Sequence, residues 1–153
     1  MKNRLTIVRG ICGSGKSFYV TEFCRRNNLK VSVHVCSADD FFYVNGVYVF
    51  DPTKLPQAHA SCMAKVIDGL TRDKLSPIFV DNTHIKRWEY QNYERLALNC
   101  GYEVEIVEFQ AETIIDVGIC AARNAHKVPQ EIVWKMAMEF EPDPEAKVFR
   151  ILR

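Results

Sequence analysis

Residues 10–17 form a glycine-rich segment, GICGSGKS, that matches the pattern G-x-x-x-x-G-K-S without a gap. Its three glycines let the backbone turn tightly and aim successive N–H groups at phosphate oxygens. Lys16 is placed to reach the β- and γ-phosphates of a nucleotide, and the Ser17 hydroxyl is placed to bind Mg²⁺. We call this segment the P-loop. Its predicted nucleotide-binding residues are Gly10, Cys12, Gly13, Ser14, Gly15, Lys16 and Ser17.

The P-loop identifies the phosphate donor, ATP or GTP, but not the acceptor. No N-K-x-D guanine-recognition signature accompanies it, which argues against a GTPase. A chain of 153 residues is also too short to hold the extra domain of a large ATPase module. What remains is a transferase that passes the γ-phosphoryl group to an acceptor hydroxyl. That reaction requires a carboxylate beside the acceptor.

Two adjacent aspartates, Asp39 and Asp40, follow the apolar segment VSVHVC at 31–36. Asp39 is the first polar side chain expected to project from the end of that segment, next to the phosphates. It is therefore the candidate general base for the acceptor hydroxyl. Asp40 is expected to cap a following turn. The alternative is that both aspartates are ordinary cap and turn residues.

The elements that must position these groups follow from the spacing of apolar residues. The expected strands cover 4–9, 31–36, 77–80 and 102–109, with KVFRIL as a short edge strand near the end. The expected helices cover 17–28, 53–72, 85–100, 112–124 and 130–140, with Gly101 ending the third. Asn45-Gly46 between aromatic and β-branched arms predicts a β-hairpin.

This alternation predicts a single α/β domain over residues 1–153, with a mostly parallel central sheet between two layers of helices. In such sheets, ligands bind at the carboxyl ends of the strands. Three polar segments follow strands at that edge: RGICGSGKS, SADD and DNTH. We expect them to converge on one crevice.

The composition excludes several classes of protein. No apolar run approaches the roughly 18 residues of a membrane span, and the start of the chain does not resemble a secretory signal. The six cysteines contain no C-x-x-C pair, so neither a structural metal site nor a redox motif is expected. A cytoplasmic or nuclear location is expected. The net charge of +1 argues against coating long nucleic acids but allows binding to a strand end.

The same segments carry a family resemblance. In order, GICGSGKS, SADDFF, GVYVFDPTKLPQAH, VDNTHIKRWEYQNYERLALNCGYEVEIVEF and AARNAHKVPQEIV resemble the 5′-hydroxyl polynucleotide kinase family, from about Leu5 to Glu141. The resemblance implies a three-layer P-loop kinase fold with a hairpin insertion and a helical lid. It implies Mg²⁺-dependent transfer of the γ-phosphate of ATP, sometimes GTP, to the 5′-hydroxyl of RNA or DNA. Asp39 matches the general base of that family.

Further site residues follow from the resemblance. Arg123 matches the lid arginine that leans onto the donor phosphates, although without the family it reads equally well as a solvated arginine. Asp81 is expected to join the Mg²⁺ shell through water. Asn82 and Thr83 are expected to touch the acceptor, a role compatible with capping the next helix. Apart from the resemblance, Arg87 is a candidate contact to the nucleic-acid backbone, although a charge at such a position is usually just solvated.

The sequence departs from the family pattern at two positions. Phage members carry an arginine where this chain has Phe42, which therefore takes that place in the predicted acceptor site. Other members carry glycine where this chain has Lys127. The aromatic side chains around Asn45-Gly46 offer a base-stacking surface or, for most of them, cover the core. His84 and His126 have no partner for a metal site and are expected on the surface or in loops.

Three hypotheses remain open. The leading one is a 5′-hydroxyl polynucleotide kinase, which would need a separate phosphatase or ligase partner to complete end repair. The second is a small-molecule kinase acting on a sugar, nucleoside or antibiotic hydroxyl, which Phe42 and the modest net charge favour. The third is a nucleotide-binding module without transfer activity. The presence of Asp39 and Arg123 together with the P-loop argues against the third.

Overall fold

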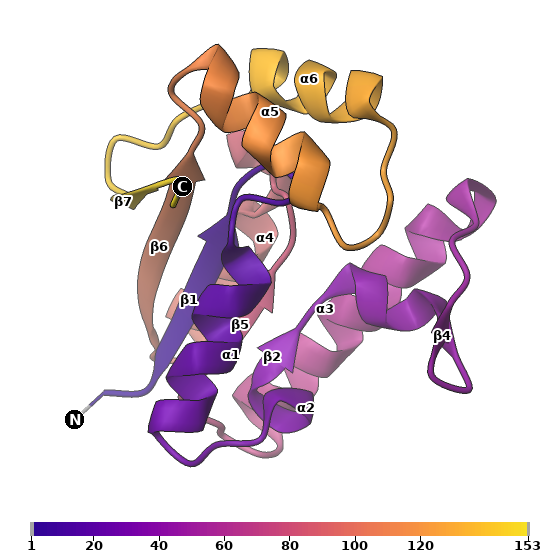
Figure 1. Ribbon diagram of the computed structural model, residues 1–153. Coiled ribbons are helices and arrows are strands. Elements are labelled where there is room, and N and C mark those ends of the chain that lie inside the picture. The colour runs from indigo at the N-terminus through magenta and orange to yellow at the C-terminus, as the bar shows by residue number, and fades with distance from the viewer. Residues whose placement is uncertain (1, 153) are drawn as a thin grey trace.

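The computed structural model describes residues 2–152, which contain a five-stranded parallel sheet in the order β2-β5-β1-β6-β7 (Figure 1). The strands are β1 (Arg4–Arg9), β2 (Val35–Cys36), β5 (Ile78–Asp81), β6 (Glu103–Gln110) and β7 (Lys147–Arg150). The register of the central strand sets Val8 beside Asp81 on one side and Val107 on the other. The carboxyl ends of these strands therefore lie together, and the predicted α/β fold is confirmed.

Helices cover both faces of the sheet and complete three layers. The main helices are α1 (Lys16–Arg26), α3 (Leu55–Thr71), α4 (Gln91–Asn99), α5 (Ile114–Arg123) and α6 (Gln130–Glu139). Leu5 and Ile7 pack with residues of α3 and α4, whereas Val8 packs with residues of α1, α5 and α6. This division follows from the alternation of side chains along a strand. Within residues 2–152, no helix combines the length and apolar character needed to cross a membrane.

The segment 31–36, predicted as one strand, forms a strand only over its last two residues. Val31–His34 makes a single helical turn, α2, and only Val35 and Cys36 pair with β5. Continuing that register would place Val33 opposite Pro77, which has no N–H to donate. Lys65 of α3 instead donates to the backbone oxygens of Ser32 and Val35. The valine-rich pattern therefore predicted a longer strand than the one that pairs with β5.

The predicted hairpin is confirmed and lies outside the main sheet. Strands β3 (Tyr43–Val44) and β4 (Val47–Tyr48) pair antiparallel through Asn45 (φ 50°) and Gly46 (φ 80°). Positive φ at both central residues is the geometry that Asn-Gly favours in a two-residue hairpin loop. In Figure 1 the hairpin extends beyond the sheet, on the side of α3. We call residues 43–48 the hairpin.

The helix predicted over 85–100 begins later than expected. A short turn, η3 (Arg87–Glu89), precedes α4, and Gly101 (φ 80°) follows the helix as predicted. A similar turn, η2 (Pro52–Lys54), leads into α3. The helical periodicity was correct, but the first turn adopts the tighter 3₁₀ geometry that is common at helix ends.

A fully buried ion pair joins the sheet to the loop after β5. The Arg9 guanidinium donates to Glu108 Oε1 at 2.6 Å and to the backbone oxygens of His84 and Ile85. Both charged side chains are 0% exposed. Glu108 Oε1 also accepts the N–H of Asp143 at 3.0 Å. These hydrogen bonds offset the cost of burying the two charges.

Replacing Glu108 with Ala will lower the free energy of unfolding by about 3–5 kcal/mol, because Arg9 would keep a buried charge without its partner. Urea denaturation measures the loss. Glu103→Ala removes an exposed pair with Arg4 and, as the matched control, will cost at most about 1 kcal/mol. The double replacement Arg9→Met, Glu108→Leu will recover part of the loss. Equal losses for Glu108→Ala and Glu103→Ala would contradict this role.

His84 lies in a loop, as predicted, but it is buried and not on the surface, with 4% of its area exposed. Its ring lies edge-on against Tyr90 and Tyr93. Its Nε2 has no hydrogen-bond partner within residues 2–152. Burial, reinforced by the nearby positive charge of Arg9, lowers the pKa of His84 to about 3. The folded protein therefore keeps this imidazole neutral.

His84 will make the protein less stable in mild acid. Below an unfolded-state pKa of about 6.5, the unfolded chain takes up a proton that the folded chain does not accept until about pH 3. The free energy of unfolding will fall as pH drops through this window, by up to about 1.4 kcal/mol per pH unit from this residue.

Denaturation series across that window will show a shallower pH dependence for His84→Asn than for the wild type. Asparagine suits the position because it tolerates the positive φ of 46° and does not titrate. His59→Asn, at an exposed histidine of α3 whose charge also lowers the pKa of His84, will keep a slope close to that of the wild type, because burial is the larger cause and remains. If all three proteins show the same slope, the buried neutral state of His84 is wrong.

Candidate active site

The P-loop runs from the end of β1 to the start of α1 and packs against α5. Gly13 (φ 76°) and Gly15 (φ 111°) adopt left-handed backbone conformations that favour glycine. A Cβ on Gly13 would lie 2.0 Å from the backbone oxygen of Cys120. The loop and the α5 backbone are therefore in direct contact, with no room for a side chain between them.

Two predicted metal-binding residues lie in contact at the end of the P-loop. The Ser17 hydroxyl donates at 3.3 Å to Oδ2 of Asp81, the last residue of β5. Asp81 is 7% exposed, and burial raises its pKa, opposed by the charge of Lys16 and the hydrogen bond from Ser17. Mg²⁺ uses one or two protein oxygens together with phosphates and waters. The pair fits that requirement, because a cation there would compensate the buried carboxylate.

Lys16 folds back over the P-loop. Its Nζ donates to the backbone oxygens of Gly10 at 2.9 Å and Ile11 at 3.0 Å. A phosphate would offer this ammonium charged oxygens in place of neutral carbonyls, and hydrogen bonds to charged acceptors are the stronger ones. Lys16 is thus positioned to exchange these partners for a nucleotide.

Two P-loop side chains predicted to bind nucleotide have other surroundings. The Cys12 thiol lies 3.7 Å from the sulfur of Met136 on α6, and burial raises its pKa. Ser14 is 2% exposed, and its hydroxyl has no hydrogen-bond partner within residues 2–152. At Cys12, the backbone N–H is the group that the predicted phosphate contact would use. The Ser14 N–H donates to Ile11 O at 3.2 Å, so the same contact at Ser14 would have to replace that hydrogen bond.

Asp39 lies in a short turn, η1 (Ala38–Phe42), that is fixed at the edge of the sheet. Ser37 caps the turn by accepting the N–H of Asp39 at 3.2 Å. The N–H of Ala38 donates to the Asn82 side chain at 2.9 Å, which ties the turn to the end of β5. The Asp39 side chain is 48% exposed and therefore open to an acceptor. The three polar segments are therefore in contact: Ser17 with Asp81, Ala38 with Asn82, and Gly10 with Thr83.

Asp40 differs from its neighbour in environment. The cap role expected for Asp40 belongs to Ser37. Partial burial raises the pKa of Asp40, and the charge of Asp39 adds to that increase against the opposing charge of Lys65. Two adjacent carboxylates thus have different surroundings, as expected for different roles.

Arg123 ends α5 beside the P-loop, as predicted for a lid arginine. Its Nε donates to Gly13 O at 2.7 Å, and its Nη1 donates to Leu152 O at 2.8 Å. The guanidinium therefore lies against the phosphate-binding loop, and its contact with phosphate stays a prediction. Asn124 closes the following turn with hydrogen bonds to Ala121 and Val128. We call residues 123–129, which connect α5 to α6, the lid loop.

His126 belongs to the site, which the sequence did not reveal. Its Nδ1 lies 3.3 Å from Asp39 Oδ2, and its ring stacks on Tyr48 with centroids 4.1 Å apart. Tyr48 donates its hydroxyl to the other Asp39 oxygen at 3.2 Å. These three residues come from the lid loop, the turn η1 and the hairpin. No local pattern could have indicated the contact, because it joins segments far apart in the chain.

The predicted acceptor-side residues have mixed outcomes. Phe42 is 3% exposed and packs against Phe50 and Tyr48, so the predicted acceptor contact by its ring is wrong. An apolar ring at that position is stabilised by joining the core under α3. Asn82 has both polar ends engaged, with Ala38 and with the Cys62 sulfur, and so positions the turn that carries Asp39.

Thr83 and Arg87 have structural partners of their own. The carbonyl oxygen of Thr83 accepts the N–H of Gly10 at 3.1 Å, which links the DNTH segment to the P-loop. Arg87 pairs with the buried Asp143 at 3.7 Å. Acceptor contacts by Asn82, Thr83 and Arg87 stay predictions.

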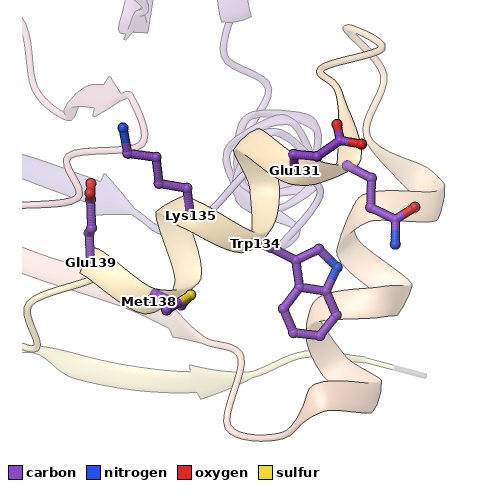
Figure 2. Close-up of a pocket in the computed structure, with 6 residues that line it drawn as sticks. Glu131, Trp134, Lys135, Met138 and Glu139 are labelled. Atoms are coloured by element: carbon purple, nitrogen blue, oxygen red, sulfur yellow. The ribbon is translucent and has the colours of Figure 1, made fainter.

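A separate hollow runs along α6 (Figure 2). Its lining side chains all come from that helix and include Trp134, Lys135 and Met138. It shares no residue with the P-loop, Asp39 or Asp81. The hollow is therefore not part of the phosphate-transfer site.

Replacing Gly13 with Ala will abolish nucleotide binding, because the new Cβ would collide with the Cys120 backbone and displace the P-loop from α5. Titration with a fluorescent ATP analogue measures the loss. Gly118→Ala is the matched control: it lies within α5, where a Cβ meets open space. That change will leave binding intact and stabilise the helix by about 0.5–1 kcal/mol. Wild-type affinity in Gly13→Ala would show that the close contact does not shape the loop.

Comparisons with known proteins agree with this geometry. The family model of an AAA domain (AAA_33) matches residues 5–142. Human NEDD4-binding protein 2 is 33% identical over 137 residues, which are 90% of this chain but only 8% of the human protein.

Two solved structures share the fold. A gluconokinase from Sinorhizobium meliloti 1021 superposes with a TM-score of 0.62 at 14% identity, covering 97% of this chain and 82% of that chain. The Pnkp1/Rnl/Hen1 complex superposes with a TM-score of 0.52 at 20% identity, covering 70% of this chain and 35% of that chain. The chain belongs to the AAA_33 family of AAA domains.

Proposed function

We propose that the protein transfers the γ-phosphate of ATP or GTP to the 5′-hydroxyl of a polynucleotide in a Mg²⁺-dependent reaction. The observation that carries the proposal is the half-exposed Asp39 carboxylate, carried by a turn that backbone hydrogen bonds to Ser37 and Asn82 fix at the same edge as the P-loop. A protein that only binds nucleotide has no use for a carboxylate held in that place.

The proposed reaction assigns one role to each group. An oxygen of Asp39 accepts the proton of the acceptor hydroxyl while the acceptor oxygen bonds to the γ-phosphorus. The bond from that phosphorus to the β–γ bridging oxygen breaks, and the nucleoside diphosphate keeps the electron pair. Lys16 and Arg123 offer positive charge to the transferring group. Mg²⁺ held by Ser17 and Asp81 would neutralise charge on the phosphates.

Exposed aromatic rings near Asp39 support a nucleic-acid acceptor. Phe41, Tyr43 and Phe50 expose 38%, 48% and 50% of their surfaces. Tyr43 is close to Asp39, because its hydroxyl lies 3.3 Å from Nε2 of His126, and the His126 ring contacts Asp39. Stacking of a base on such a ring contributes about 1–3 kcal/mol and tolerates any sequence. The ordered resemblance to polynucleotide kinases across the chain supports the same acceptor.

One contact favours a second candidate, a kinase for a small hydroxylated metabolite. The hairpin and the lid loop meet beside Asp39, through Tyr43, Tyr48 and His126. A bridge there narrows the approach to the base, which suits a compact acceptor such as a sugar. The superposition on the solved structure named as a gluconokinase covers most of both chains. A sugar acid is therefore a reasonable probe.

Replacing Asp39 with Asn will lower phosphate transfer about 100- to 10,000-fold, the usual contribution of a general base, while ATP binding is retained. The assay follows label from γ-labelled ATP with Mg²⁺ to a short 5′-hydroxyl RNA, a matching DNA and gluconate. Asp40→Asn is the neighbouring control and will keep most of the activity.

The outcomes separate the candidates. Label on a strand that disappears in Asp39→Asn supports the polynucleotide kinase, and the RNA-to-DNA ratio defines its preference. Label on gluconate alone moves the assignment to the small-molecule kinase. Undiminished transfer by Asp39→Asn would refute Asp39 as the base.

A further inference from the structure

Side chains from outside its own turn contact both oxygens of the Asp39 carboxylate. The Tyr48 hydroxyl donates to Oδ1 at 3.2 Å, and His126 Nδ1 lies 3.3 Å from Oδ2. The His126 ring lies flat on the Tyr48 ring, with an interplanar angle of 10°. A carboxylate accepts about four hydrogen bonds, so an acceptor hydroxyl can still bind Asp39 while both partners stay in place.

The contacts of His126 place its two ring nitrogens between Tyr43 and Asp39. A carboxylate oxygen accepts hydrogen bonds, so Nδ1 is the nitrogen that would donate to Asp39. The Tyr43 hydroxyl lies 3.3 Å from Nε2 and forms a hydrogen bond with it. The ring therefore bridges the hairpin and the proposed base. An imidazole oriented at one nitrogen by a hydrogen bond to the other is a common way to fix a functional histidine.

The lid loop places this histidine close to the donor as well. Arg123, at the start of the same loop, donates to Gly13 O in the P-loop. Asn124 closes the turn between the two residues through its bonds to Ala121 and Val128. One short segment thus contacts the phosphate-binding loop at one end and the proposed base at the other.

We propose that His126 is a positioning residue for phosphate transfer, which orients Asp39 from the lid loop through an Nδ1–H hydrogen bond. The proposal rests on the function proposed above for Asp39. At 3.3 Å the two atoms are farther apart than in most hydrogen bonds, and catalytic hydrogen bonds often tighten only in the complex with substrate. A partly exposed contact of this kind contributes little to stability. Its effect falls on the transfer step, where the orientation of the base decides the rate.

Three replacements of His126 separate the effect of its Nδ1–H donor from the effect of its ring stacking on Tyr48. His126→Phe keeps a ring to stack on Tyr48 but has no donor. His126→Asn keeps a donor near the position of Nδ1 but has no ring. His126→Ala has neither. His59→Ala, at an exposed histidine of α3, controls for loss of a histidine elsewhere.

Steady-state kinetics with the acceptor found above will show that His126→Ala and His126→Phe lower kcat about 10- to 100-fold, with KM for ATP nearly unchanged. His126→Asn will restore kcat to within a few-fold of wild type, and His59→Ala will match wild type. Thermal unfolding checks that each variant is folded. Full activity in His126→Phe, or a loss in His126→Asn as large as in His126→Ala, would overturn the positioning role.

A second measurement keeps this inference separate from the identity of the acceptor. Nitrogen NMR of His126 in the full chain will report a protonated Nδ1 that shifts when Asp39 is replaced with Asn. If no strand is labelled by the wild type but the shift is seen, the proposed acceptor fails and the contact stands. If the shift is absent, the inference fails whatever the acceptor.

Discussion

Arg9 is the last residue of β1, and its guanidinium is fixed before the chain enters the P-loop. It binds Glu108 of β6, the backbone of the loop after β5 and the faces of the Tyr90 and Phe140 rings. Glu108 in turn accepts the backbone N–H of Asp143, and Tyr90 donates to the Asp143 carboxylate at 2.7 Å. One buried pair thus sets two central strands, the DNTH loop and the segment before β7 relative to each other. Such a pair contributes modestly to net stability, but it leaves few alternative arrangements once buried, because any other would strand a charge.

The candidate site depends on this arrangement because its acidic groups come from different loops. Asp39 and Asp40 follow β2, and Asp81 ends β5, so three carboxylates gather at one edge. Burial raises the pKa of Asp81, and the charges of Asp39 and Asp40 add to that increase. Lys16 is the cation that acts on the Asp81 carboxylate from the P-loop side. A site with excess negative charge binds a divalent cation well, and a nucleotide brings that cation with it.

A hairpin and a loop, set on the edge of the sheet, meet beside Asp39. Loops carried by a rigid scaffold are where binding specificity usually resides. The hairpin presents aromatic rings, and the lid loop presents His126 and, beside it, Lys127 with a positive φ of 54°. The contact between the two elements limits the space around Asp39.

Residue types and their spacing were enough to predict the P-loop and the hairpin turn. The glycine spacing, Lys16 and Ser17 define a P-loop in any context, and Asn-Gly defines the hairpin turn, because both depend on backbone conformations that few residues adopt. The parallel α/β fold followed from periodicity, and strand ends at one edge brought Ser17 to Asp81 as expected.

Tertiary structure alone decided the remaining features. Pro77 on the neighbouring strand, and not the valine pattern, sets where β2 begins. Packing under α3 turns Phe42 into the core and away from the acceptor, and burial beside Arg9 keeps His84 neutral. The hairpin and lid loop meet across 83 residues of chain, at Tyr43 and His126. A sequence determines such a contact only through the whole fold, because the free energy that holds the two segments together comes from the packing of the elements that carry them.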